Sequence, residues 1–244
     1  GLDTNDPGMP LRILQARAHL ESGAVERAVL EFDGVIMRNE SFRYDLLDIY
    51  EDALERFDDN PTLHLALYHL HLDEDRPVQA ARHLCRTLEL DPGQIRDVLE
   101  RFDAIASSHP AERGVWEALL DTALRMKHGD LARETLRRAL AALPENDAAA
   151  LHLYGARISA DDDDSENGLR CIALALTAPE ADLRAIEIEL RRVLDREPGN
   201  PEAAFLLGDC LLRLGDERSA VEILERCIDN SAAYLSTVRE RAES

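Results

Sequence analysis

The sequence predicts an all-α protein, and three observations favour this fold class. From Pro10 onward, apolar residues recur with a helical period almost throughout the chain. No segment shows the strict alternation of apolar and polar residues that a half-buried strand requires. The composition is rich in Leu, Ala, Glu, Arg and Asp, with only 5% aromatic residues, as is typical of helical proteins.

Helix-breaking residues divide this pattern into elements. Proline cannot continue a helix, and glycine or asparagine readily takes the left-handed conformation at a helix end. Such breaks occur at Gly23, Asn39, Asn60-Pro61, Pro77, Pro92-Gly93, Pro110, Gly129, Pro144, 161–164, Pro179, Pro198-Gly199 and Gly215. The segments between them predict helices at 10–22, 25–38, 41–57, 61–73, 76–90, 93–107, 111–127, 130–143, 147–159, 164–177, 181–196, 200–214, 217–228 and 230–242.

The domain organisation expected from this reading is simple. Residues 1–9 are polar and contain proline and glycine, so we expect a disordered leader or linker there. No linker-like segment interrupts the helical pattern further on. Residues 10–244 are therefore expected to form a single helical domain.

The clearest internal pattern lies at residues 201–232. Gly208 and Ala220 are small residues at the points where two helices would touch, and Leu207, Leu211 and Leu224 fill the rest of the seam. This segment resembles the tetratricopeptide repeat, a helix–turn–helix unit of about 34 residues that stacks into a solenoid. The resemblance implies a right-handed superhelical solenoid of antiparallel helix pairs, with a concave face that binds other proteins.

Weaker matches to the same repeat extend the resemblance along the chain. The segments concerned are 9–40, 61–92, 113–144 and 148–179. In the last of these, Tyr154-Gly155 and Pro179 match, but the second helix fits poorly. The starts at 9, 61 and 113 are 52 residues apart, and 41–57 resembles 93–107 at the same offset. Either some units contain three helices or part of this similarity is accidental. We favour an irregular solenoid whose helices alternate up and down without a break.

The charge of the chain bears on its partners. Lys and Arg number 28 against 49 Asp and Glu, which gives a net charge of −21. Such a charge repels nucleic acid and anionic lipid. No apolar run approaches the roughly 20 residues needed to span a bilayer. The charge favours a basic partner, or serves simply to keep the chain soluble. We therefore expect a protein or peptide partner, with no nucleic-acid binding and no membrane insertion.

The four cysteines indicate a reducing compartment. Cys85, Cys171, Cys210 and Cys227 form no CxxC pair, and each falls within a predicted helix. Cysteines in this setting behave as small buried hydrophobes. We expect free thiols and a cytoplasmic location.

Two clusters keep a metal- or calcium-binding protein open as an alternative function. In the acidic run 161–168, Asp163, Ser165, Asn167 and Gly168 imitate the first half of a calcium loop, but Leu174 stands where a bidentate Glu is needed. We interpret the run as an inter-helix turn in which Asp164 or Ser165 caps the next helix.

The second cluster consists of histidines. His64, Tyr68 and His71 share one helical face, with His69 and His83 nearby in sequence. Histidines on adjacent turns can bind a transition metal, yet no carboxylate has HExxH-like spacing. We expect packed or solvated histidines, no metal site and no cofactor.

No catalytic signature is present in the sequence. There is no GxSxG elbow, Gly-rich phosphate loop or zincin motif. We therefore nominate no catalytic residue and expect a protein that is not an enzyme.

The resemblance implies binding residues on the concave face. Its groove positions correspond to Glu202, Phe205, Asp209, Leu212 and Arg213 in the 201–232 unit, and to Thr62, Leu65, His69, Leu72 and Asp73 in the 61–92 unit. The Lys and Asn residues of the family's carboxylate clamp are absent. We predict a peptide-binding surface formed by Phe205, Asp209 and Arg213, with His69 and Asp73 from an earlier helix. The predicted function is a non-catalytic scaffold or adaptor; a recognition module cut from a larger multidomain protein is the alternative.

Overall fold

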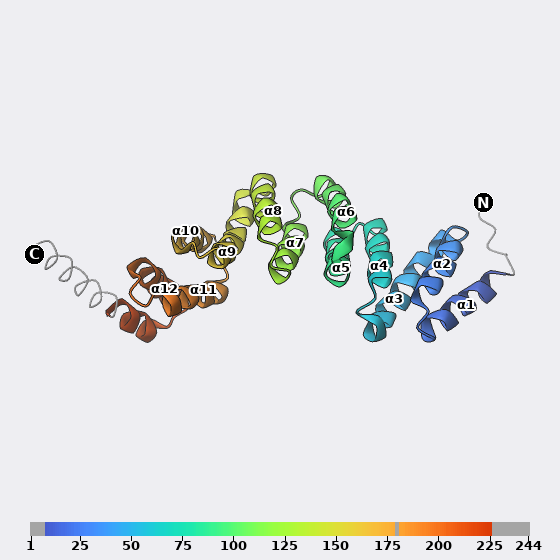
Figure 1. Ribbon diagram of the computed structural model, residues 1–244, viewed down its shortest axis with the longest axis horizontal. Helices are drawn as coiled ribbons and strands as arrows, with labels where there is room; N and C mark the ends of the chain where they lie inside the picture. Colours follow the sequence, from blue (N-terminus) through green and yellow to red (C-terminus); the bar gives the residue numbers. More distant parts are fainter. Residues whose placement is uncertain (1–7, 179–180, 226–244) are drawn as a thin grey trace, which may run out of the picture. The chain divides into compact units, whose positions relative to one another are not determined.

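The computed structural model describes residues 8–178 and 181–225, and these residues form helices and connecting turns without a strand (Figure 1). The all-α prediction is confirmed. The helices are α1 (Met9–Glu21), α2 (Val25–Ile36), α3 (Arg43–Phe57), α4 (Pro61–Asp73), α5 (Pro77–Leu90), α6 (Ile95–Ser108), α7 (Arg113–Arg125), α8 (Gly129–Ala142), α9 (Glu145–Asp161), α10 (Ser165–Leu176), α11 (Leu183–Arg196) and α12 (Pro201–Arg213), followed by helical residues 217–225.

The chain divides into two compact units. The first spans Gly1–Met126 and the second Lys127–Ser244, so the division falls in the turn between α7 and α8. In the first unit α1 packs on α2, α4 on α5, and α5 on α6 and α7. In the second unit α9 packs on α8 and α10, and α12 packs on α11. A single solenoid over residues 10–244 and its right-handed superhelix stay predictions.

Local sequence explains where the best predicted helices begin. The Asn60 side chain accepts a hydrogen bond from the Leu63 N–H at 3.0 Å, and Asn200 accepts one from Ala203 at 3.0 Å. In each case the next residue is a proline in the first turn of the helix. An N–H group at that position would have no partner within the helix, so proline loses no hydrogen bond there. The predicted start of α4 is therefore confirmed, and that of α12 is displaced by one residue.

A left-handed residue ends the first helix of each pair. Positive φ angles occur at Gly23, Asp75, Lys127, Asp163 and Gly215. After four of these residues, the next N–H reaches back to a carbonyl five residues earlier, as in Arg76 to His71 and Asp216 to Leu211. This hydrogen bond closes a Schellman-type cap. Gly129, which the sequence suggests as a break, instead begins α8.

These turns correct the register of the fifth repeat. In the repeats that start at 9, 61, 113 and 201, the left-handed residue lies at the same distance from the start. Asp163 meets that rule only if the fifth repeat starts at 149, not 148. Gly168 then takes the place that Ala220 has in the last repeat, and both residues are buried. A start at 148 places the second helix one residue out of phase, which explains its poor fit to the repeat.

The spacing of 52 residues reflects genuine three-helix repeats. α3 starts at Arg43 and α6 at Ile95, each preceded by a short 3-10 turn. α11 starts at Leu183, which is as far from residue 149 as Arg43 is from residue 9. We call α3, α6 and α11 the third helices. The three-helix alternative is thus confirmed for these repeats, whereas the repeat starting at 113 passes directly from α8 to α9.

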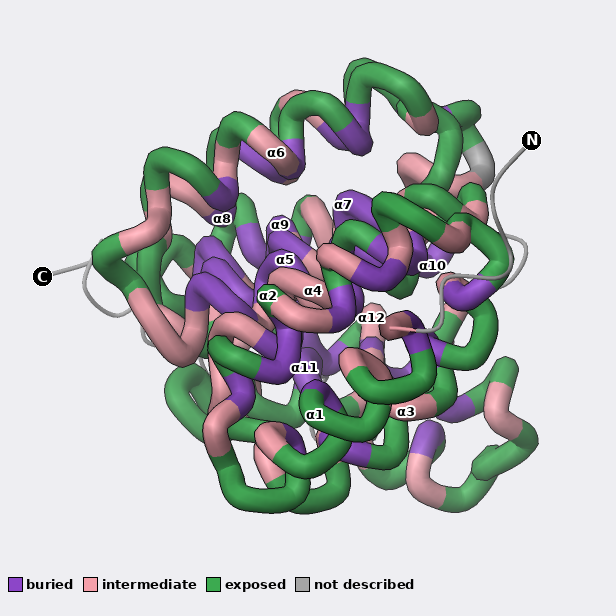
Figure 2. Tube along the Cα trace, turned by 90° about the vertical axis from the view of Figure 1, so that its right-hand side faces the viewer, coloured by how far each residue is buried: buried purple, intermediate pink, exposed green. Residues whose placement is uncertain are grey.

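Small residues allow the paired helices to approach closely. Ala28, Ala80, Ala132 and Ala220 occupy one register position, and each is fully buried. A Cβ added at Gly208 would lie 2.8 Å from the Leu224 side chain, and one at Gly155 would lie 2.8 Å from Cys171 Sγ. The predicted seam between Gly208, Ala220 and Leu224 is therefore confirmed. Figure 2 shows buried and exposed residues alternating along the helices, as amphipathic packing requires.

Three of the cysteines lie in the described residues, where they are free thiols. Cys85 and Cys210 are buried as predicted, whereas Cys171 is only partly buried. Cys227, the helix predicted at 230–242 and most of the predicted leader lie outside the described residues. In the described part of the chain, none of the helices is both long and apolar enough to span a bilayer.

The seam between α12 and residues 217–225 provides a test of the packing. Ala220→Leu should lower the free energy of unfolding by about 1–3 kcal/mol, because a larger side chain must displace the fully buried contact. Glu222→Leu is the matched control, since Glu222 is exposed and forms a surface ion pair with Arg218. Urea denaturation of both variants measures the difference. Equal midpoints would contradict the assigned register.

Candidate functional site

The surface of α12 carries the predicted residues in one stripe. Phe205 is 65% exposed, although it is a large apolar side chain. Asp209 forms an ion pair with Arg213 at 2.9 Å, and Arg213 Nη1 also donates to the Leu176 carbonyl at the end of α10, at 2.8 Å. The opposite side of α12, including Leu207 and Leu211, is buried. The charged pair is therefore held beside an exposed aromatic ring.

His69 and Asp73 have partners on the third helices. Arg101 of α6 lies 3.1 Å from His69 Nε2, and its guanidinium stacks over Tyr68. Asp73 forms an ion pair with Arg43 of α3 at 3.3 Å. Burial, followed by the charge of Arg101, lowers the pKa of His69. A peptide would have to compete with these contacts. The two parts of the predicted surface belong to different units, α4 to the first and α12 to the second.

Sequence reasoning missed Arg43 and Arg101 because the two-helix repeat has no place for a third helix. The same contact recurs in the second unit. Arg157 of α9 occupies the register position of His69, and Glu189 of α11 occupies that of Arg101. Arg157 Nε donates to Glu189 at 3.1 Å, and Arg192 adds a second ion pair at 2.9 Å. In these two repeats, the first and third helices are thus joined by polar groups at one fixed position.

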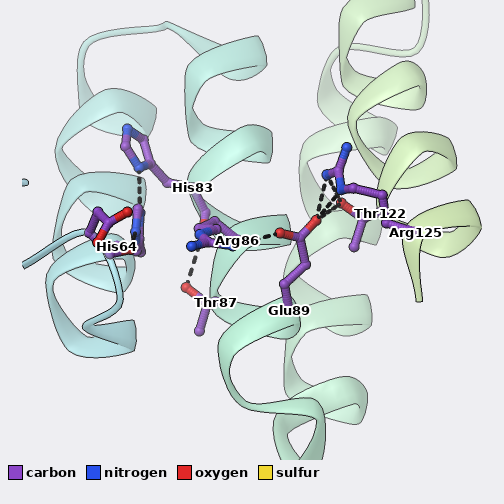
Figure 3. A network of polar contacts seen from close by, with 8 residues as sticks. His64, His83, Arg86, Thr87, Glu89, Thr122 and Arg125 are labelled. Atoms are coloured by element: carbon purple, nitrogen blue, oxygen red, sulfur yellow. Dashed lines mark hydrogen bonds and ion pairs between the residues drawn. The ribbon is translucent and has the colours of Figure 1, made fainter.

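A histidine cluster lies between α4 and α5 (Figure 3). His64 Nε2 lies 2.8 Å from the Asp58 carbonyl, which can only accept, so this nitrogen carries the proton. His64 Nδ1 must then accept from His83 Nδ1, 3.0 Å away. His71 stacks on His83 with ring centroids 5.1 Å apart. The prediction that His64 and His71 are packed is confirmed by their burial.

The cluster disfavours protonation. Burial, followed by the neighbouring His64 and His71, lowers the pKa of His83 to about 4. Burial also lowers the pKa values of His64 and His71, although the nearby Asp58, Glu51 and other acids oppose the change. A second proton on the His64–His83 pair would place two N–H groups against each other. The cluster is therefore neutral near neutral pH.

A carboxylate network joins α5 to α7 further along the same face (Figure 3). Glu89 accepts hydrogen bonds from Arg125 Nε at 2.8 Å, Thr122 at 3.1 Å and Arg86 at 3.1 Å. Burial alone would raise the pKa of Glu89, but these hydrogen bonds outweigh it and hold the pKa below its ordinary value. Because the Glu89 carboxylate accepts hydrogen bonds from side chains of both helices, we interpret the network as a structural link between α5 and α7.

The acidic run forms the turn between α9 and α10. Asp164 caps α10 by accepting from the Asn167 N–H at 3.1 Å, which confirms the capping interpretation. Asp162 pairs with Arg133, and Asp163 lies 3.9 Å from Arg196. Asn167 Nδ2 donates to Ser159 Oγ. Asp164 and Asn167 are thus used in contacts within the protein, and the described residues hold no group of three or more His, Cys, Asp or Glu side chains that could bind a metal.

Comparison with known proteins identifies one segment by sequence. Residues 185–232 match the family model described as tetratricopeptide repeat. No curated protein matches the chain. Among solved structures, MamA is similar at 15% identity with a TM-score of 0.27, and the alignment covers 83% of this chain and 96% of MamA. YrrB, described as a TPR protein with an unusual peptide-binding site, is similar at 14% identity with a TM-score of 0.29, covering 79% of this chain and 97% of YrrB. Such low TM-scores mean that neither structure superimposes on the present chain as a whole.

The capping role of the acidic run leads to a prediction for calcium. Because Asp164 is used as a cap and Asp162 pairs with Arg133, calcium should bind no tighter than about millimolar. Isothermal titration calorimetry measures this affinity. A micromolar isotherm that Asp163→Ala abolishes would instead support the calcium-binding alternative.

The histidine cluster leads to a prediction for pH. An unfolded histidine has a pKa of about 6.5, whereas that of His83 in the folded chain is about 4. Between these values the unfolded chain binds more protons, so the stability should fall as the pH is lowered through this range. We expect the Tm from circular dichroism to decrease from about pH 7.5 to about pH 5.

The matched control for this experiment is a histidine outside the cluster. His83→Gln should reduce the dependence of Tm on pH, because it removes the group with the lowered pKa. His19→Gln, in α1, should leave that dependence as it is. If both variants follow the parent curve, another group causes the acid sensitivity.

Proposed function

We propose that this chain is a non-catalytic scaffold or adaptor that binds a protein or peptide, because residues 185–232 match the tetratricopeptide repeat family model. Stacked helical repeats expose long surfaces and bury few convergent polar groups, which suits recognition. The family match supports the general role. The partner and the residues that bind it are our proposal.

The observation that carries this proposal is the stripe on α12. An aromatic side chain that is 65% exposed loses contact with water when a partner covers it, and aromatic residues are frequent binding hot spots. Asp209 and Arg213 sit beside it as a fixed pair, which can align polar groups of a peptide. We propose that Phe205, Asp209 and Arg213 form the contact surface in the second unit. In the first unit, we propose that His69 and Asp73 contact the peptide by giving up their contacts with Arg101 and Arg43.

The charge of the chain supports a basic partner. A net charge of −21 attracts cationic segments at long range and speeds their association. The same charge opposes nucleic acid. The free thiols of Cys85 and Cys210 suit a cytoplasmic location, which we include in the proposal.

The α12 stripe can be tested once a partner is available from affinity capture and mass spectrometry. Phe205→Ala should weaken binding by more than about 1 kcal/mol without lowering the Tm, because the ring is exposed in the free protein. Binding should also weaken as salt rises. Ile188→Ala is the control, since Ile188 is an exposed apolar residue on the neighbouring α11. A partner that binds the Phe205→Ala variant as tightly as the parent would move the site elsewhere.

A further inference from the structure

A groove of about 390 Å³ lies between α1 and α3 in the first repeat. Its floor is apolar and consists of Leu20, Ile49, Ala53 and Phe57. Ile49 and Phe57 are only partly buried, although they pack on the hydrophobic core. The groove is therefore wide enough to accept a side chain and offers it apolar contact.

One wall of the groove is acidic. Asp45, Asp48 and Asp52 line it from α3, at a spacing that places them on one helical face. All three are exposed, and among the described residues none of them has an ion-pair partner. By contrast, buried Glu189 and partly buried Glu89 are held by arginines.

The two arginines that line the groove do not neutralise the negative charge of this wall. Arg56 donates to the backbone carbonyl of Glu21 at 3.1 Å and lies over the Phe57 ring. Arg17 forms no ion pair with another described residue. Four acids and two arginines line the groove, so its net charge is negative.

The corresponding helices of the second unit enclose a smaller space. A pocket of about 20 Å³ lies between α9, α10 and α11, and its residues Ala160, Glu189 and Arg192 have the register positions of Leu20, Ile49 and Asp52 in the groove. There Glu189, bound to Arg157 and Arg192, fills the position that Ile49 has in the first repeat. In α4 and α6, the same contact is made by His69 and Arg101.

The groove of the first repeat is open because two residues of its third helix differ from their counterparts in α11. Arg17 corresponds to Arg157, but Ile49 replaces the carboxylate of Glu189 and cannot pair with it. Asp52 replaces Arg192 and reverses the charge. The composition of this groove is thus specific to the first repeat.

We propose that the α1–α3 groove binds a basic amphipathic peptide segment of a partner. An apolar side chain of the segment rests on Ile49 and Phe57, and its lysines or arginines face Asp45, Asp48 and Asp52. The apolar floor suits a peptide better than a hydrated metal ion. A second copy of this chain is disfavoured because each copy carries −21 charges. The inference rests on the proposed peptide-binding function and adds a site and a partner class to it.

The experiment uses a labelled peptide with leucines on one helical face and lysines on the other. Its affinity for the full chain is measured by fluorescence anisotropy. Asp45→Asn with Asp48→Asn should weaken binding by about three- to tenfold, because two exposed charge pairs are lost. The counterpart peptide with glutamates in place of lysines should not bind.

The chain supplies a matched control at the equivalent positions of the next repeat. Asp97 and Glu100 of α6 are exposed and lie 52 residues after Asp45 and Asp48. Asp97→Asn with Glu100→Gln removes the same charge from the same helical register. It should leave the affinity unchanged if the groove is the site. An equal loss in both double variants would show that the peptide binds only to the general negative field, and would overturn the proposal.

The variant Ile49→Glu distinguishes binding in the groove from general electrostatic attraction. This variant adds a negative charge but recreates the carboxylate that pairs with Arg157 in the second unit, so it should close the groove towards Arg17. The proposal therefore predicts weaker binding, whereas simple charge attraction predicts tighter binding. Circular dichroism checks that the variant is folded, and Ile49→Ala, which removes the floor without adding charge, should also weaken binding.

The remaining outcomes also decide the question. A parent chain that fails to bind the lysine peptide overturns the groove as a basic-peptide site, while the Phe205→Ala experiment with the captured partner tests the general function independently. Self-association of the parent chain that Ile49→Glu abolishes, measured by sedimentation, would assign the groove to a second copy instead.

Discussion

The tight turn inside each helix pair is the constraint on which the rest of the structure depends. Its left-handed residue reverses the chain within three residues and fixes the start of the second helix. Five residues after Gly23, Asp75, Lys127, Asp163 and Gly215 comes a buried Ala or Gly. The turn therefore sets the register that places the smallest residue in the helix pair. Only two of these turns use glycine, so the others accept a left-handed Asp or Lys at a cost of about 1–2 kcal/mol. Packing of the pair must offset that cost.

Much of this architecture can be predicted from the sequence, but the register of each repeat cannot. Asn-Pro before α4 and α12 marks helix starts through a side-chain cap and a proline that needs no partner. A left-handed Asp163 gives no comparable signal, because aspartate is equally at home in caps and exposed turns. Tyr154 and Gly155 resemble the repeat in a register one residue out of phase, and they therefore predict a start at 148 and not at 149. The third helices had a signal, the offset of 52 residues, but their meaning depended on contacts that no single sequence displays.

The candidate site is likewise only partly predictable from the sequence. Exposure of Phe205 follows from its place opposite a buried seam, and a helical period is enough to predict it. The partners of His69 and Asp73 could not be predicted, because Arg101 and Arg43 come from helices outside the two-helix repeat. Tyr68, which stands where the last repeat has the small Gly208, is buried beneath Arg101 and so forms part of the same contact. A residue that departs from a repeat's usual pattern was here a sign of an additional element, not of a weak match.

The polar contact between first and third helices gives each repeat a position that can change without altering the fold. Where a pair is formed, as in Arg157 with Glu189, the interior is closed and a buried charge is compensated. Where Ile49 replaces the carboxylate, the hydrophobic core is still complete below it, because Leu46 and Tyr50 of the same helix are buried. The three aspartates on α3 then repel one another, and like charges at this spacing destabilise a helix by about 0.2–0.5 kcal/mol per pair. Asp45 recovers part of that cost by lying in the first turn, near the positive end of the helix dipole. Asp48 and Asp52 lie further along and gain nothing comparable from within the described chain. A cation brought by a partner would remove the repulsion, which makes the charge pattern of α3 more favourable in a complex than in the free protein.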